Sequence, residues 1–477
     1  MTDPLRDSQA AALLWALEHP RSGLFLPMGF GKTRVVLEGL SFHEWPRTLV
    51  VAPKRVAEDV WPEQIEMWTP GVTYSLAAGS AKERVAALAA DAAIYIIGRD
   101  NLAWLVNQGL KEVRTVLGVR RSKPFEAIII DELSSFKSHR SARFRALRSL
   151  TLNPKTPPPT VWGLTGTPAS DNLMDLWAEV YVLDGGDALG KGLTNFRDRF
   201  FEPDNPHKPF PKMIPKAGAE QAIYQKLAGT CLSMGTDIMT GLIPEVTYNR
   251  INVTLPRKLR DEYDTFMQHA VWGILGFETI TQADGTHLRR PILADNAIPT
   301  SGAASLRSKA LQYTSGFLYD GAREVQRIHT AKLDAAEEIV ESLDGDPLLV
   351  FYRFTAERDA LKARLRDKAH FMKGPDVVKD WNKGKIPVLL AHPQSAGHGL
   401  NLQHGGCQML WLSMPDSQQD WSQSVRRLLR PGQQRPVTVS RLAVTGTWDD
   451  PAYDNVMGKL RVEQALLTHL SALRWTD

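Results

Sequence analysis

A short segment near the start of the chain, residues 26–33, carries side chains that could hold a phosphate group. It reads LPMGFGKT, follows an apolar run and opens a predicted helix from Lys32 to Leu40. Glycines in such a turn let backbone N–H groups close around phosphate oxygens, and the helix N-terminus adds partial positive charge. Lys32 would reach the β- and γ-phosphates of a nucleotide, and the Thr33 hydroxyl would bind Mg²⁺. The residues expected to contact the nucleotide here are Met28, Gly29, Phe30, Gly31, Lys32 and Thr33.

One position of this segment departs from the usual phosphate-binding pattern, because Leu26 stands where glycine or alanine is typical. The simpler alternative is a glycine-containing β-turn that binds nothing. A second feature of the sequence is needed to separate the two interpretations.

A pair of carboxylates, Asp131 and Glu132, directly follows the apolar run Ile128–Ile130. Ligands of open α/β sheets bind at the carboxyl ends of strands, so both side chains are well placed to face a nucleotide. Asp131 is suited to bind Mg²⁺, directly or through water, and Glu132 to orient and deprotonate an attacking water. The alternative is a pair of exposed carboxylates that cap the next helix. Their occurrence downstream of the glycine segment favours the phosphate interpretation.

Short β-branched runs alternate with helical patterns in two regions of the chain, which is typical of strands buried on both faces of a parallel sheet. In the first region the runs are 48–52, 93–97, 127–130 and 161–164. In the second region they are 348–352, 387–391, 408–412 and 437–444, with a helical pattern over 332–343. The sequence therefore predicts an α/β protein with two lobes.

The part of the chain between these regions has a different character. Prolines crowd residues 203–215, which excludes a helix there and predicts a stiff surface crossing. The polar stretch 282–302 predicts an irregular loop, and helical patterns around it predict helical protrusions. The expected domains are lobe one at 1–235, with a helical, proline-rich extension from about 185, and lobe two at 236–477, with a helical insertion at about 257–330.

The composition is that of a globular protein, with 43% hydrophobic and 23% charged residues in a chain of 477. The net charge of +4 neither requires nor excludes a nucleic-acid partner. Two cysteines, Cys231 and Cys407, cannot build a disulfide framework or a four-cysteine zinc site, which indicates a reducing compartment. The first residues lack the pattern of a signal peptide, and no run of about eighteen apolar residues predicts a membrane span. We therefore expect a cytoplasmic protein without a membrane partner.

Further motifs accompany these two segments in a fixed order. They are LRDSQ at 5–9, VAPKRV at 51–56, GLTGTP at 163–168, LLVFYRF at 348–354, SAGHGLNL at 395–402 and QSVRRLLRPGQ at 423–433. Together the motifs resemble those of superfamily-two helicases, and more narrowly the Swi/Snf-type DNA translocases in the compact form found in bacteria and bacteriophages. The resemblance runs along nearly the whole chain, and its last motif is highly specific. It implies two RecA-like parallel-sheet lobes with helical insertions between and on them.

Several positions depart from the family's patterns. The sequence DELS at 131–134 is neither DEAD nor DEAH, and TGTP stands where DEAD-box proteins carry SAT. Both differences argue against the RNA helicases named for those letters. Ser395 and Ala396 stand where AGG is usual, and Ser424 replaces an alanine.

The last motif contains two arginines, Arg427 and Arg430, which on a helix would share one face. Two arginines that converge on a γ-phosphate stabilise the charge of the transition state, and an arginine finger contributes roughly 10³–10⁵ in kcat. A solvated basic helix end is the alternative. The resemblance favours the catalytic role, and it implies that Gln9 contacts the adenine base and that Gln423 belongs to the nucleotide site.

The resemblance also implies that ATP with Mg²⁺ binds between the lobes, and that the catalytic set is complete only when they close. Thr165 and Thr167 would link the γ-phosphate to the nucleic-acid face. Contacts with nucleic acid would go mostly to phosphates and would be independent of sequence. The residues expected to make them are Lys54, Arg55, Arg353, Ser395, Gly397 and Asn401.

The implied function is a nucleic-acid-stimulated ATPase that translocates on double-stranded DNA, in the cytoplasm of a bacterium or an infected host cell. A strand-separating DNA or RNA helicase is one alternative, which unwinding of a forked duplex would favour. A catalytically inactive nucleic-acid-binding scaffold is another, and the intact set of candidate catalytic residues argues against it. A third is the motor subunit of a nuclease assembly, whose nuclease would be a separate partner.

Overall fold

The computed structural model describes residues 4–118, 125–155, 157–207, 211–235, 241–281, 287–300, 302–374, 376–396 and 400–472. Its contacts divide the chain into two compact units. The first unit contains 1–242, 417–422 and 458–477, and the second contains 243–416 and 423–457. In the described ranges, none of the helices is both long and apolar enough to span a bilayer.

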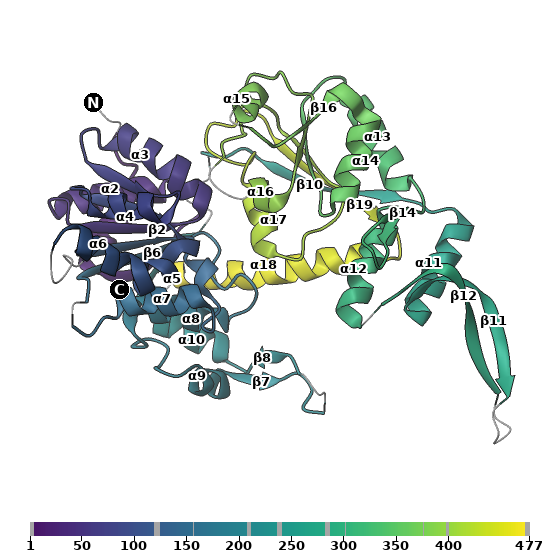
Figure 1. The fold of residues 1–477 in the computed structure, drawn as a ribbon, viewed down its shortest axis with the longest axis horizontal. Helices are drawn as coiled ribbons and strands as arrows, with labels where there is room; N and C mark the ends of the chain where they lie inside the picture. The colour runs from purple at the N-terminus through teal and green to yellow at the C-terminus, as the bar shows by residue number, and fades with distance from the viewer. Residues whose placement is uncertain are drawn as a thin grey trace. The chain divides into compact units, whose positions relative to one another are not determined.

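The first unit, which contains the purple and blue helices and strands of Figure 1, is built on a seven-stranded sheet. The strand order is β3-β4-β2-β5-β6-β1-β9, and every neighbouring pair is parallel. Its strands are β1 (Arg21–Phe25), β2 (Thr48–Ala52), β3 (Tyr74–Ala77), β4 (Ile94–Gly98), β5 (Ala127–Asp131), β6 (Thr160–Thr165) and β9 (Cys231–Ser233). The four strands expected in this region are confirmed as β2, β4, β5 and β6.

Helices connect these strands. They are α1 (Asp7–Glu18), α2 (Lys32–Phe42), α3 (Trp61–Trp68), α4 (Ala81–Ala89), α5 (Leu102–Trp104), α6 (Leu110–Val116), α7 (Ala142–Thr151), α8 (Asp175–Asp184), α9 (Leu193–Phe200) and α10 (Ala219–Leu227). Short turns of other helix types lie at Val56–Val60 (η1, a π-helix) and Leu133–Phe136 (η4, a 3₁₀ helix). The proline-rich segment is not helical where it is described, and its ends form the hairpin of β7 (Phe201–Pro203) and β8 (Met213–Pro215).

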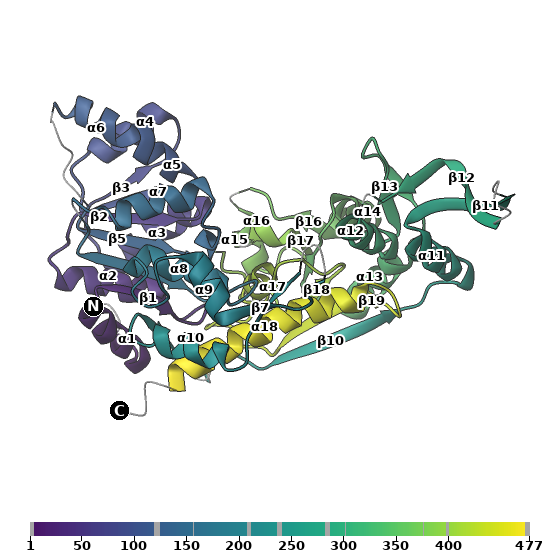
Figure 2. The same cartoon turned by 90° about the horizontal axis from the view of Figure 1, so that it is seen from below.

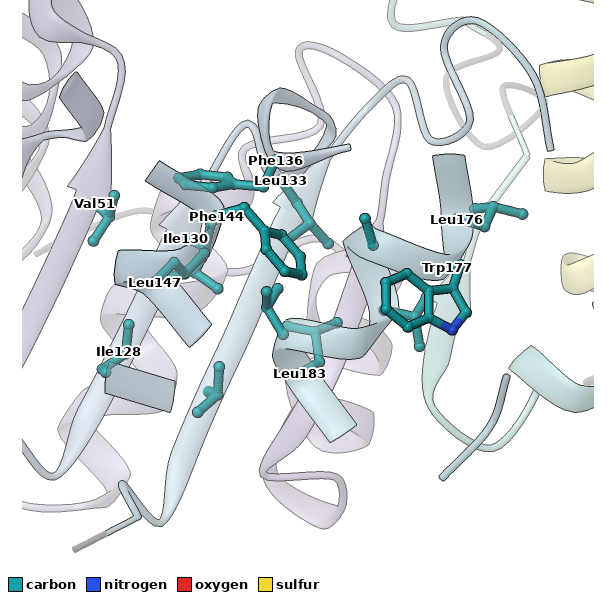
Figure 3. Close-up of a cluster of buried hydrophobic side chains, with 14 of the residues drawn as sticks. Val51, Ile128, Ile130, Leu133, Phe136, Phe144, Leu147, Leu176, Trp177 and Leu183 are labelled. Carbon is teal, nitrogen blue, oxygen red and sulfur yellow. The ribbon is translucent and has the colours of Figure 1, made fainter. Parts of the chain in front are cut away.

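The core of the first unit explains why β5 reads as an unbroken apolar run. Ile128 and Ile130 pack against α7, η4 and α8 in one cluster, which Figure 3 shows with Val51 of the neighbouring strand. Ile129 points to the opposite face and is also fully buried. A strand covered on both faces needs apolar side chains at every position. The apolar run ends at Asp131, the last residue of β5, and Asp131 and Glu132 are only partly buried.

The second unit has a six-stranded parallel sheet in the order β10-β19-β18-β15-β17-β16. Its strands are β10 (Val246–Val253), β15 (Leu348–Phe351), β16 (Ala369–Phe371), β17 (Val388–Ala391), β18 (Gln408–Trp411) and β19 (Val437–Val444). The four strands and the helix expected in this region are confirmed. The unit's helices include α11 (Arg257–His269), α12 (Ala303–Thr314), α13 (Ala331–Ser342), α14 (Thr355–Leu365), α15 (Val377–Asn382) and α16 (Pro393–Ala396). The helices α17 (Gln418–Val425) and α18 (Asp449–Ala472) contribute residues to both units.

The irregular loop predicted over 282–302 is wrong. Residues 287–299 form the strand β12 (His287–Pro299), which pairs in antiparallel register with β11 (Val271–Thr281). Figure 2 shows this long hairpin projecting at one end of the second unit, beside α11. The polar composition concealed the strand, whose backbone pairs with β11 along the hairpin. A second, short hairpin joins β13 (Phe317–Tyr319) and β14 (Val325–Arg327).

Candidate nucleotide site

Three neighbouring strands of the first unit place the candidate nucleotide residues at one edge of the sheet. The strands β1, β6 and β5 lie side by side, with Phe25 opposite Thr165 and Leu164 opposite Asp131. Because the strands are parallel, their carboxyl ends meet at the same edge. The glycine segment after β1, the carboxylate pair at the end of β5 and the TGTP segment at the end of β6 therefore lie at this edge, with the TGTP segment in the middle.

The loop after β1 has the backbone of a phosphate-binding turn. Gly29 and Gly31 have φ angles of 80° and 91°, which glycine adopts without steric cost. The φ of Gly31 strains any residue with a side chain, and a β-carbon there would also lie 2.5 Å from Nε2 of Gln9, whose side chain would have to move. The helix α2 begins at Lys32, directly after the loop. Leu26, the departure from the usual pattern, is fully buried and serves the core rather than the loop surface.

The ammonium of Lys32 lies over the loop that precedes it. Its Nζ donates to the carbonyl oxygens of Leu26, at 2.9 Å, and Pro27, at 3.2 Å. The backbone N–H of Leu26 in turn donates to Thr165 at 3.1 Å, which ties the loop to β6. The positive charge is therefore held at the loop, where phosphate oxygens would be better acceptors than neutral carbonyls.

Gln9 contacts the glycine loop from α1. Its Nε2 donates to the carbonyl oxygen of Phe30 at 2.9 Å, and its Oε1 accepts the backbone N–H of Arg6 at 3.1 Å. The Arg6 guanidinium donates to the same carbonyl of Phe30. Sequence reasoning singled out Gln9 but missed Arg6, although Arg6 lies within the same LRDSQ motif. The structure places both side chains beside the glycine segment.

Both carboxylate oxygens of Asp131 accept hydrogen bonds. Trp61 Nε1 donates to Oδ2 at 2.9 Å, and the backbone N–H of Glu132 donates to Oδ1 at 3.0 Å. Burial raises the pKa of Asp131, while the Trp61 hydrogen bond and the charge of Lys32 act in the opposite direction. The contact with Trp61 was not predicted, because it joins residues 70 positions apart.

Glu132 has an unusual backbone for a residue with a side chain. Its φ and ψ are 56° and 59°, in the left-handed region, and it directly precedes the 3₁₀ turn η4. Such conformations cluster at functional sites, where the surrounding structure holds them. Burial lowers the pKa of Arg99. The negative charges of Asp100 and Glu132 offset part of this shift. Arg99 is a neighbour of the candidate base that sequence reasoning missed.

The TGTP segment after β6 lies against the glycine loop. A β-carbon at Gly166 would lie 2.9 Å from Cγ of Met28, so the two segments approach as closely as a glycine allows. Thr165 and Thr167 are both buried, and Thr165 Oγ1 accepts the backbone N–H of Thr167 at 3.0 Å. Within the described residues, the Thr167 hydroxyl has no hydrogen-bond partner. This buried hydroxyl is available to a ligand at the sheet edge.

A cluster of charged residues lies beneath the same segment. Lys137, after η4, donates to Ser170 at 3.0 Å and to the carboxylate of Asp171. Glu179 of α8 is fully buried, and burial together with the charge of Asp175 raises its pKa to about 8. The charge of Lys137 and the backbone N–H of Ala169 oppose this shift without cancelling it.

In the second unit, Arg427 and Arg430 converge on one carbonyl group. Their Nη1 atoms donate to the oxygen of Leu400 at 3.1 and 3.0 Å, and Arg430 also donates to Asn401 Oδ1 at 2.7 Å. Burial lowers the pKa of Arg430. The two guanidinium groups are therefore brought together at one carbonyl oxygen.

The two arginines do not lie on a helix, which corrects the prediction that they share a helical face. The helix α17 ends at Val425, and the chain turns tightly, with the N–H of Arg427 bonded to Ser424 at 3.0 Å. Pro431 follows Arg430, and the residue before a proline avoids the helical region. The arginines converge through the turn and Leu400 instead.

Side chains around this turn hold the SAGHGLNL segment in place. Gln433 Nε2 donates to the carbonyls of Gln403 and Gly406, each at 2.8 Å, and Trp381 donates to Leu402 at 2.8 Å. Gln423 is buried, and its Nε2 has no hydrogen-bond partner in the described part of the chain.

The candidate nucleic-acid residues are spread over both units. Lys54 and Arg55 are exposed and follow β2, before the π-helical turn η1. Arg353 forms a bidentate ion pair with Asp416, at 2.7 and 2.5 Å. Asn401 is exposed and accepts from Arg430. Ser395 lies in the short helix α16. Gly397 lies outside the described residues.

The residues of the first unit fit a nucleoside triphosphate with Mg²⁺. The left-handed glycines leave a cradle at the start of α2, Lys32 supplies a cation, and Thr167 offers a buried hydroxyl. Thr33, in the first turn of α2, and Asp131 supply the hard oxygen ligands that Mg²⁺ prefers.

A two-unit parallel α/β protein with a candidate nucleotide site at a glycine loop is the class that this fold and these residues define. A family model described as the SNF2-related domain matches residues 8–285, and the chain belongs to that family. It is 33% identical to putative protein p41 of Acyrthosiphon pisum secondary endosymbiont phage 1, over 94% of this chain and 95% of that protein.

More distant relatives are larger proteins. The chain is 22% identical to the ISWI chromatin-remodeling complex ATPase ISW2 of Saccharomyces cerevisiae, over 97% of this chain but 41% of that protein. A related yeast protein, ISW1, is also 22% identical and is covered over 38% of its length. Among solved structures, the Sulfolobus solfataricus SWI2/SNF2 ATPase core in complex with dsDNA matches with 18% identity and a TM-score of 0.44, over 100% of this chain and 95% of that one.

Proposed function

We propose that this protein is an ATPase that couples ATP hydrolysis to translocation along double-stranded DNA. The observation that carries the proposal is that Lys32, after β1, and Asp131 and Glu132, at the end of β5, lie at one edge of the sheet, with β6 between the two strands. Membership of the SNF2-related family supports it, as does likeness over nearly the whole chain to an ATPase named for chromatin remodelling.

In the proposed reaction, Lys32 exchanges the carbonyls of Leu26 and Pro27 for the β- and γ-phosphates of ATP. Thr33 and Asp131 would hold Mg²⁺, which when bound offsets negative charge on the phosphates. Glu132 accepts a proton from the water that attacks the γ-phosphorus. The neighbouring Thr167 hydroxyl is a donor for the γ-phosphate, which makes the TGTP segment sensitive to the presence of that group.

Arg427 and Arg430 complete the proposed site from the second unit. Their convergence on Leu400 holds two positive charges together, which suits an acceptor with several negative oxygens. Because they belong to a different unit from Lys32, hydrolysis would require both units and could drive their relative motion.

Contacts with DNA are proposed at Lys54 and Arg55 of the first unit, and at Arg353, Ser395, Gly397 and Asn401 of the second. Arg353 is held by Asp416, so a phosphate would have to replace that carboxylate. Such contacts read no base sequence and weaken as salt concentration rises.

ATP hydrolysis by the purified protein tests the proposal. The rate is measured without nucleic acid, and with single-stranded DNA, duplex DNA of increasing length and structured RNA. Stimulation that grows with duplex length is the expected result, because a moving enzyme stays bound longer on a longer track. The variant Lys32→Ala is the control for contaminating activity.

Other results would favour the other interpretations. Stimulation by single strands or RNA alone, with unwinding of a forked duplex, would indicate a strand-separating helicase. Binding of DNA without hydrolysis under any of these conditions would indicate a scaffold.

A further inference from the structure

The buried indole of Trp61 donates a hydrogen bond to Asp131, a candidate metal ligand. Trp61 is the first residue of α3 and is fully buried. Its Nε1 lies 2.9 Å from Oδ2 of Asp131. The side chain therefore reaches from α3 to the end of β5, where the nucleotide residues gather.

The hydrogen bond restricts the orientation of the Asp131 carboxylate. One oxygen accepts from Trp61 and the other from the backbone N–H of Glu132, so both ends of the carboxylate plane are fixed by rigid donors. Each carboxylate oxygen has a second lone pair, so these bonds leave room for a metal ion or its water ligand. Mg²⁺ demands near-ideal octahedral geometry, which makes its affinity sensitive to the orientation of a ligand.

We infer that Trp61 is a positioning residue that sets the magnesium affinity of the nucleotide site through Asp131. The inference rests on the proposed function, in which Asp131 holds Mg²⁺ with ATP. Hydrogen-bond partners behind metal ligands typically contribute 10- to 100-fold to metal affinity or activity. Trp61 has the burial and rigidity of such a partner, and no contact with phosphate is required of it.

The variant Trp61→Phe tests the role, because it removes the N–H and keeps most of the apolar ring. The matched control is Trp68→Phe on the same helix, where the lost N–H donates to Gln64 at 3.0 Å instead. Binding of a fluorescent ADP analogue is measured in EDTA and during a Mg²⁺ titration. We expect unchanged binding in EDTA for both variants, and about a tenfold higher Mg²⁺ concentration for half-maximal effect in Trp61→Phe alone.

Coupling through Asp131 is checked with Asp131→Ala. In that background, adding Trp61→Phe should change the Mg²⁺ dependence no further, because the group that Trp61 orients is absent. A merely structural tryptophan would instead weaken binding in EDTA as well, or would add its effect to that of Asp131→Ala, and either result would overturn the inference. An unchanged Mg²⁺ dependence in a folded Trp61→Phe protein would do so too.

Failure of the inference can be told apart from failure of the proposed function. If the unmodified protein bound the nucleotide analogue without any Mg²⁺ dependence, the assignment of Asp131 itself would fall. If Trp61→Phe does not fold, benzothienylalanine at position 61 removes only the N–H and keeps the shape of the indole. The same tenfold shift is expected for it.

Discussion

The ammonium of Lys32 is turned back onto the carbonyl oxygen of Leu26, 2.9 Å away. This contact neutralises no charge, so the cation keeps its attraction for a phosphate and is already at the loop that would hold one. Pre-positioned charge of this kind stabilises a transition state without reorganisation.

Replacement of Lys32 should therefore remove hydrolysis. For Lys32→Ala we expect kcat to fall at least about 100-fold, by analogy with the loss of one donor to a developing negative charge. A phosphate-release assay with saturating ATP measures it. The control is Lys191→Ala, an exposed lysine after α8, which should hydrolyse ATP at the normal rate. Equal rates for the two variants would contradict the assignment of Lys32.

Glu132→Gln should separate binding from chemistry. The amide keeps the size of the side chain but cannot accept the proton of the attacking water, so we expect a loss of about 10²–10⁴ in kcat. Nucleotide affinity, measured by equilibrium binding of a fluorescent ATP analogue, should change little. Loss of affinity in parallel with loss of rate would instead assign Glu132 to nucleotide binding.

Arg430→Ala should lower kcat by roughly 10³ or more, as expected for removal of an arginine that stabilises phosphoryl transfer. Arg427→Ala should act in the same direction, since both side chains share the Leu400 carbonyl. Arg435→Ala is the matched control, because this arginine is half exposed and pairs with Asp346. Single-turnover hydrolysis distinguishes the variants. An Arg435→Ala rate as low as that of Arg430→Ala would point to a general effect on folding.

Lys54→Ala and Arg55→Ala should weaken the response to DNA without changing basal hydrolysis. Each lost phosphate contact should reduce the slope of log affinity against log salt by about 0.9. Affinity for a labelled duplex, measured by anisotropy at several salt concentrations, gives the slope. The control is Lys385→Ala, an exposed lysine of the second unit that pairs with Asp380. An unaltered slope in both test variants would remove residues 54–55 from the interface.

Glu179 should make the stability of the protein fall as the pH rises. Its pKa is raised from 4.5 to about 8 in the folded state. Between these values the folded protein holds a proton that the unfolded chain has released, so the free energy of unfolding declines by up to about 1.4 kcal/mol per pH unit. Below pH 4.5 both states are protonated and the full stability is present.

Glu179→Gln should remove this dependence, because the amide stays neutral at every pH. We expect the variant to match the unmodified protein near pH 5 and to be more stable at pH 8, as measured by urea unfolding. The exposed Glu112→Gln is the control and should leave the pH profile unchanged. A profile for Glu179→Gln that runs parallel to that of the unmodified protein would show that Glu179 does not titrate in this way.

The parallel sheets could be predicted because their strands are buried on both faces. Ile128–Ile130 is apolar at every position, and the polar pair that follows had to lie at the strand end. The position of a site at the carboxyl edge follows from that topology. The glycine loop could be predicted for a related reason, since its positive φ angles at Gly29 and Gly31 demand glycine.

Other features depend on contacts that a linear pattern does not contain. The hydrogen bond from Trp61 to Asp131 joins residues 70 positions apart, and no local sequence pattern around either residue predicts this contact. The strand β12 is fixed by its partner β11 rather than by its own composition. The spacing of Arg427 and Arg430 predicted a shared helical face, and this was wrong because α17 ends at Val425, before either arginine.

The left-handed backbone of Glu132 has a consequence for how this protein can evolve. An ordinary residue gives up about 1–2 kcal/mol in that conformation, which glycine would recover. A chain selected for heat resistance alone would thus be drawn toward glycine at position 132, and would lose the carboxylate proposed to activate water. As long as hydrolysis is under selection, this stabilising substitution is rejected. Thermostable variants of this protein must therefore be stabilised by substitutions at other positions.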